Sequence, residues 1–123
     1  MKKLLLSILV LTSANAMAHG QFPQVISKYV MSENVEVEFT LGNYFAKQTC
    51  FDIEVNGAIM SPMRECLQPN QTRKMSVWVT TPPDHVTENQ VCSIANTPGM
   101  LRTRMCTIAT TLYPRKELLN TTE

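Results

Sequence analysis

The residues of this chain best suited to chemistry are its two histidines, His19 and His85. A histidine that begins a mature chain can bind copper through its terminal amine and its imidazole, and a second imidazole completes such a site. His19 comes first only if a signal peptidase cuts after Ala18. His85 follows two prolines and Asp84, a context typical of a solvated turn. Copper binding by His19 and His85 is therefore an alternative function, not the main one.

Residues 1–18 have the three parts of a bacterial secretory signal peptide. A charged KK pair precedes an apolar run, LLLSILVL, which is followed by a stretch of small residues, TSANAMA. The apolar run is far shorter than the roughly 20 residues that a membrane-spanning helix needs. We therefore expect a periplasmic protein that is not inserted in a membrane after cleavage.

Exported chains with an even number of cysteines usually form disulfides. This chain has four cysteines: Cys50, Cys66, Cys92 and Cys106. In a hairpin, the numbers of facing residues have a constant sum, so a Cys92–Cys106 pair is centred on the Pro98-Gly99 turn. A Cys50–Cys66 pair is centred just beyond the Asn56-Gly57 turn and needs a looser connection through Ser61-Pro62. Of the three possible connectivities, the sequence favours 50 with 66 and 92 with 106.

The composition excludes several classes of function. Removal of the signal peptide leaves nine basic and ten acidic side chains, so the mature chain lacks the basic excess that nucleic acids or anionic membranes attract. The sequence contains no Gly-x-Ser-x-Gly, His-Glu-x-x-His or glycine-rich phosphate motif. It also lacks the Cys-x-x-Cys of redox enzymes. We therefore expect a protein that is not an enzyme.

Alternation of apolar and polar residues over 35–41 (VEVEFTL) is the clearest structural signal and is typical of a half-buried strand. Six further segments have strand signals and are separated by Gly, Asn and Pro turns: 25–30, 50–55, 58–60, 75–80, 91–95 and 101–112. Seven short strands and no convincing helix predict an all-β protein, a single immunoglobulin-like antiparallel sandwich. Trp78 lies in one of these strands, and we expect it to pack against other side chains.

The predicted strands place one domain within residues 19–114. A domain of this size has a modest core and often needs further stabilisation. Each disulfide would contribute about 2–4 kcal/mol. Residues 115–123 are predicted to be a polar C-terminal tail.

Arg102 and Arg104 are two residues apart and share one face of the last predicted strand. A solvated sheet face is sufficient to explain such a pair. Functionally, a positive strand at a sheet edge could attract an acidic partner and prevent indiscriminate edge pairing. We take Arg102 and Arg104 as the candidate partner-binding residues.

Three stretches of the chain together resemble a known family. They are KQTCFDIEVNG at 47–57, LQPNQTRKMSVWVTTPPDHV at 67–86 and a final hairpin that ends at Tyr113-Pro114. Their order resembles that of the small curli assembly accessory proteins of the CsgC type. The resemblance implies a single periplasmic immunoglobulin-like domain that keeps amyloid-forming fibre subunits soluble during export.

A small disulfide-linked sandwich without a catalytic motif acts by presenting its surface to another macromolecule. An exposed sheet edge offers unpaired backbone donors and acceptors to an unfolded or fibre-forming client. The sequence thus predicts a non-enzymatic, periplasmic accessory or chaperone-like protein that binds an exported client and uses no cofactor. A periplasmic copper carrier is the alternative.

The first testable prediction concerns the mature N-terminus. Cleavage after Ala16 or after Ala18 satisfies the small-residue rule, and we expect the second because it leaves a seven-residue c-region after Leu11. The intact mass of the exported protein should therefore correspond to a chain that begins with His19. A mass that corresponds to a chain beginning with Met17 would contradict this.

Overall fold

The computed structural model describes residues 18–96 and 102–120. Most of the predicted signal peptide (1–17), the Pro98-Gly99 turn and the last residues of the predicted tail (121–123) lie outside the described residues. No helix in the described part is long and apolar enough to cross a membrane.

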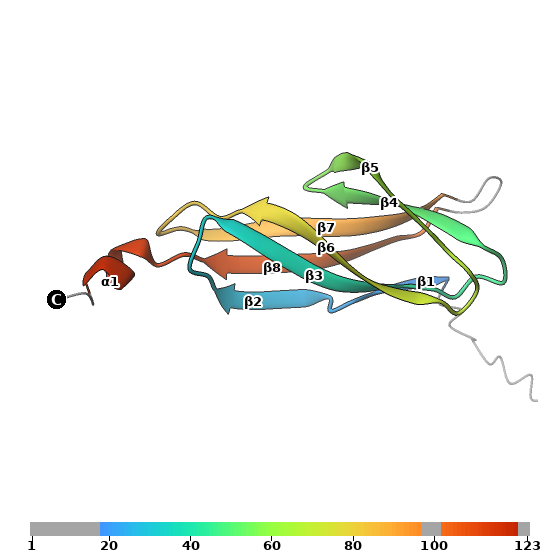
Figure 1. The fold of residues 1–123 in the computed structure, drawn as a ribbon, viewed down its shortest axis with the longest axis horizontal. Helices are drawn as coiled ribbons and strands as arrows, with labels where there is room; N and C mark the ends of the chain where they lie inside the picture. The colour runs from blue at the N-terminus through green and yellow to red at the C-terminus, as the bar shows by residue number, and fades with distance from the viewer. Residues whose placement is uncertain (1–17, 97–101, 121–123) are drawn as a thin grey trace, which may run out of the picture.

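The described chain folds into two packed β-sheets (Figure 1). Its elements are β1 (His19–Phe22), β2 (Val25–Tyr29), β3 (Asn34–Asn43), β4 (Thr49–Val55), β5 (Ala58–Leu67), β6 (Thr72–Thr80), β7 (Val86–Asn96), β8 (Arg104–Leu112) and α1 (Arg115–Asn120). Sheet A has the strand order β1-β3-β6, and sheet B has the order β2-β8-β7-β4-β5. The predicted all-β sandwich is confirmed.

The alternation that predicted a strand over 35–41 builds one half of the core. Val35, Val37, Phe39 and Leu41 are buried on the inner face of β3, whereas the glutamates between them face outward. The opposite wall of the core comes from sheet B, where Phe51, Ile53, Val91 and Ala109 are fully buried. Burial of such side chains stabilises the fold by about 1.5–3 kcal/mol for each large one.

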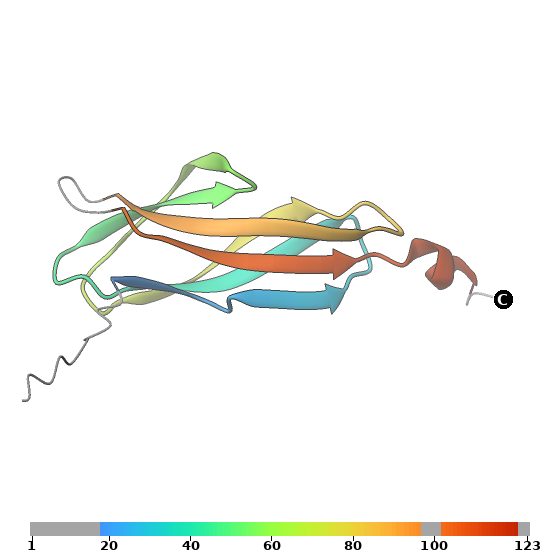
Figure 2. The same cartoon turned by 180° about the vertical axis from the view of Figure 1, so that it is seen from behind.

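The N-terminal segment contributes a strand to each sheet. β1 pairs antiparallel with β3 in sheet A, and β2 pairs parallel with β8 in sheet B (Figure 2). The chain crosses between the sheets at Phe22-Pro23, which is a cis peptide bond. Both sheets are therefore tied together at this side of the sandwich by one continuous segment.

Four expectations about the elements are wrong. The chain has an eighth strand, β1, and β5 extends over ten residues instead of three. No helix was expected, yet residues 115–120 form the short helix α1, whose Lys, Glu and Leu residues have high helix propensity. Trp78 does not pack in the core, because it is on the outer face of β6 and 64% exposed.

Both predicted disulfides are present, as Cys50–Cys66 and Cys92–Cys106. Each joins residues directly opposite one another in neighbouring strands. The looser connection expected for Cys50–Cys66 takes the form of a register shift between Asp52 and Glu54. β5 continues through Pro62. Proline has no backbone N–H to donate, and an edge strand tolerates it where the backbone nitrogen faces away from the neighbouring strand.

We predict that the two disulfides differ in accessibility to reductant. Cys66 is exposed on the edge strand β5, whereas Cys92 is 1% exposed in the central strand β7. Because a reducing thiolate must reach a sulfur atom, mild dithiothreitol followed by alkylation should label Cys50 and Cys66 first. Peptide mapping against reduction time checks this. Equal or reversed labelling rates would contradict it.

Candidate binding surface

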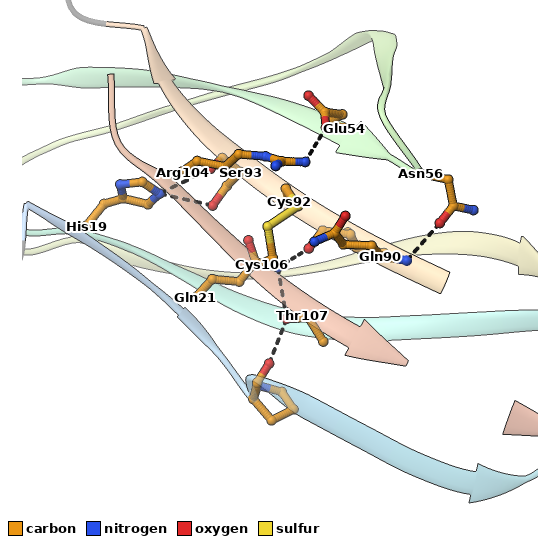
Figure 3. The surroundings of a disulfide bond; sticks show 12 residues. His19, Gln21, Glu54, Asn56, Gln90, Cys92, Ser93, Arg104, Cys106 and Thr107 are labelled. Carbon is orange, nitrogen blue, oxygen red and sulfur yellow. Dashed lines mark hydrogen bonds and ion pairs between the residues drawn. A yellow bond between two sulfur atoms is a disulfide. The ribbon is translucent and has the colours of Figure 1, made fainter. Parts of the chain in front are cut away.

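His19 points into the sandwich, not to a metal-binding position at the surface. Its side chain is 2% exposed and its ring lies 5.0 Å from that of Phe51, centroid to centroid. Nε2 lies 3.2 Å from the hydroxyl of Ser93 (Figure 3). Nδ1 lies within hydrogen-bond distance of Thr103 Oγ1. The imidazole therefore links β1 to sheet B.

The structure does not bring His19 and His85 together. His85 is exposed and directly precedes β7, whereas the His19 ring contacts Ser93, eight residues after His85 along the same strand. At about 3.3 Å per strand residue, this stretch spans roughly 25 Å, so the two imidazoles cannot share an ion within one molecule. No group of three or more His, Cys, Asp or Glu side chains among residues 18–96 and 102–120 is arranged to hold a metal.

The two candidate arginines do not lie on an edge strand, contrary to expectation. β8 lies between β2 and β7, and the edges of sheet B are β2 and β5. Arg104 begins β8 and forms an ion pair with Glu54 at 2.6 Å, whereas Arg102 precedes the strand and is exposed. Protection of a free edge is therefore not a role for this pair, although binding of an acidic partner by Arg102 stays a prediction.

β8 has an inverted pattern of side chains. Three residues of its inward face, Thr107, Ala109 and Thr111, are small and at most 1% exposed, and Met105 on the same face is partly buried. Its larger apolar residues Ile108 and Leu112 point instead to the outer face of sheet B, where they are only half-buried. A sandwich that used β8 only for its core would place the larger residues inside.

Neighbouring strands extend the outward apolar surface of β8. Val25 of β2 lies opposite Ile108, and Leu112 is flanked by Tyr29 of β2 and Val86 of β7. Val25, Tyr29 and Val86 are 66%, 77% and 70% exposed. We call these residues the apolar patch: Val25, Tyr29, Val86, Ile108 and Leu112. Figure 2 shows the three strands side by side on this face.

The apolar patch adjoins a hollow and a free strand edge. A hollow of about 260 Å³ lies between β2 and β8, lined by Tyr29, Val86 and Leu112 among others. β2 pairs with β8 on one side, and no strand of the described chain pairs with its other side. Such an edge leaves backbone donors and acceptors available to an added strand.

The apolar patch was not predicted from the sequence. A strand was expected over 101–112, with no assignment of the face that is buried. In fact the threonines face inward, where Thr107 accepts a hydrogen bond from Gln21 Nε2 and donates one to the carbonyl of Pro23.

Comparison with known proteins identifies the fold. No family model and no curated protein matches the chain. Among solved structures, the E. coli chaperone DraB has a TM-score of 0.59 at 16% identity, and the periplasmic chaperone SfaE has a TM-score of 0.59 at 9% identity. A PapD-like domain of human CEP192 has a TM-score of 0.55 at 10% identity. The chain has the fold of an immunoglobulin-like β-sandwich.

The extent of these matches differs between the proteins. In each case they include 78% or 79% of this chain. The chain spans only a little over half of the two chaperones, 55% of DraB and 58% of SfaE, but 85% of the CEP192 domain. At these identities the similarity shows the fold alone.

Protonation of His19 should destabilise the protein. Burial lowers the pKa of its imidazole from 6.5, and the hydrogen bond to the Ser93 carbonyl partly opposes this. The unfolded chain therefore binds this proton more readily, so the free energy of unfolding should fall as the pH drops below about 6.5, by at most about 1.4 kcal/mol per pH unit. Urea unfolding between pH 7.5 and 5 measures this.

The matched variants are His19→Gln and His85→Gln. His19→Gln should flatten the pH dependence because the titrating group is gone, whereas His85→Gln, which changes an exposed side chain, should keep the wild-type slope. A wild-type slope in His19→Gln would show that another group is responsible.

Proposed function

We propose that this protein is a non-enzymatic, chaperone-like protein of the periplasm that binds an exported client protein in an extended conformation. The observation that carries the proposal is the inversion of β8, which places Ile108 and Leu112 outside and threonines inside. Exposed apolar patches of this kind are typical of protein interaction sites.

The proposed binding mode combines the apolar patch with the free edge of β2. A client strand that pairs with Val25–Tyr29 would extend sheet B beyond its edge. Its outward side chains would then lie next to Val25 and Tyr29, in continuity with the apolar surface of β8. Main-chain hydrogen bonds would give affinity for many clients, and the apolar contacts would select segments that would otherwise aggregate.

Four further observations support the periplasm and a fibre-forming client. The sequence has signal-peptide features at its start, and both disulfides suit an oxidising compartment. Two proteins of similar fold are chaperones, one of them periplasmic. The sequence resemblance to the CsgC-type accessory proteins makes a subunit of an extracellular fibre, such as curli, the client that we propose.

The test is a thioflavin time course of an aggregating exported fibre subunit with and without this protein. We expect a longer lag at substoichiometric ratios, with the client intact by mass spectrometry. Val25→Ser with Val86→Ser should raise the concentration needed for a given delay by on the order of tenfold, because less apolar surface is buried on binding. Both side chains are exposed, so folding should be unaffected.

Ile59→Ser is the matched control, because it removes an exposed apolar side chain (62%) from β5, away from the apolar patch. It should behave as the wild type. An unchanged lag with equimolar wild-type protein would refute the chaperone function. In the same assay Arg102→Glu tests the predicted role of the arginine, and an unaltered lag would remove that role.

A further inference from the structure

A second free edge lies in the other sheet, on β3. β1 pairs with β3 only over Thr40–Asn43, because the chain then crosses to sheet B. β6 pairs with the opposite side of β3 over nearly its whole length. The first half of β3 therefore has a neighbour on one side only within the described chain (Figure 1).

The hydrogen-bond pattern identifies which backbone groups face this edge. The Tyr44 amide donates to the Ala18 carbonyl on the β1 side, and antiparallel ladders alternate sides from residue to residue. Even-numbered residues of β3 thus direct their backbone groups towards β1. In agreement, the carbonyl of the odd-numbered Glu33 accepts from Thr81 on the β6 side. Glu36 and Glu38 therefore direct their amides and carbonyls to the open edge.

Space for an added strand is present beside these groups. A groove of about 630 Å³ lies between β3 and the end of β2 and continues over the outer face to Trp78. Ile26 and Val35 line it on the inner side, and Glu36 and Glu38 line it on the outer side. Lys28 is the one cation among its lining residues, so the two carboxylates leave the groove with a net negative charge.

We propose that this groove binds an extended segment of another polypeptide in which basic and apolar residues alternate. An antiparallel strand that continues the line of β1 would form its hydrogen-bonded pairs with Glu36 and Glu38. Its side chains opposite those residues would lie on the outer face beside the two carboxylates, which favours lysine or arginine. The side chain between them would point inward towards Ile26 and Val35, which favours an apolar residue.

The same geometry disfavours a second copy of this protein as the occupant. Antiparallel pairing of two β3 edges would place glutamates opposite glutamates, and like charges directly across a ladder are destabilising. A long basic side chain, in contrast, would reach both a carboxylate and the exposed indole of Trp78, which is opposite Glu36 on β6. The pair of glutamates thus blocks self-association while it selects a basic partner.

The experiment titrates the full-length mature protein with the peptide acetyl-SVKVKVS-amide, followed by amide NMR and hydrogen exchange. The amides of Glu36 and Glu38 should exchange rapidly in the free protein and become protected when the peptide binds. Those of Val35 and Val37, which face β6, should be protected throughout. The peptide acetyl-SVEVEVS-amide should not bind.

Glu36→Gln with Glu38→Gln should weaken binding of the basic peptide by about two- to thirtyfold, because two cross-strand charge pairs are lost. Glu88→Gln is the matched control, since Glu88 is an exposed strand residue on the outer face of sheet B. Equal binding of both peptides, or binding without protection of the two amides, would overturn the proposal. Concentration-dependent protection without peptide would show self-pairing and overturn it as well.

This proposal is independent of the chaperone function. Val25 and Val86 are not among the residues that line the β3 groove, whereas Tyr29 belongs both to the apolar patch and to the groove lining and is unchanged in both sets of variants. The glutamate variants leave the apolar patch unchanged. Failure in one experiment therefore does not decide the other.

Discussion

The structure depends on one constraint: a strand can complete the backbone hydrogen bonds of only one sheet at a time. The first half of the segment from His19 to Tyr29 pairs with β3 of sheet A, and its second half pairs with β8 of sheet B. This joins the two sheets along one side of the sandwich. It also leaves each sheet with a strand edge that the same segment cannot cover, one on β3 and one on β2. Both proposed binding surfaces lie beside those edges.

The crossing also explains why the interior is polar on this side. Gln21 Nε2 donates to the Val91 carbonyl and to Thr107, and Thr107 donates to the Pro23 carbonyl (Figure 3). Together with the His19 contacts, these hydrogen bonds hold β1 against sheet B. Hydrogen bonds fix the orientation of the groups that they join, whereas apolar contacts are not directional. Thr107 of β8 serves these bonds, and Thr111 hydrogen-bonds to Thr81, so the larger apolar residues Ile108 and Leu112 are left on the outside.

Features that depend on local patterns were predictable from the sequence. The alternation in β3 gave its buried face, and the symmetry of hairpins gave both disulfide pairs. Strand β1 was not predicted because its sequence, HGQF, buries the polar residues His19 and Gln21 and exposes Phe22. A half-buried strand normally has apolar residues inside and polar residues outside. The edge position of β2 was not predictable either, because it depends on which strands are neighbours in space. The apolar patch and the groove combine strands distant in sequence, so neither has a local signature.

The placement of the two disulfides has a consequence for the unfolded chain. Each closes a loop between adjacent strands, with sequence separations of 16 and 14 residues. At roughly 3.4 Å per residue, the two loops together remove about 100 Å from the contour length of the oxidised chain. Such a chain cannot pass through a narrow pore in single file, because at each loop two segments must pass together. Reduction of both disulfides is therefore needed before the unfolded chain can extend to its full length.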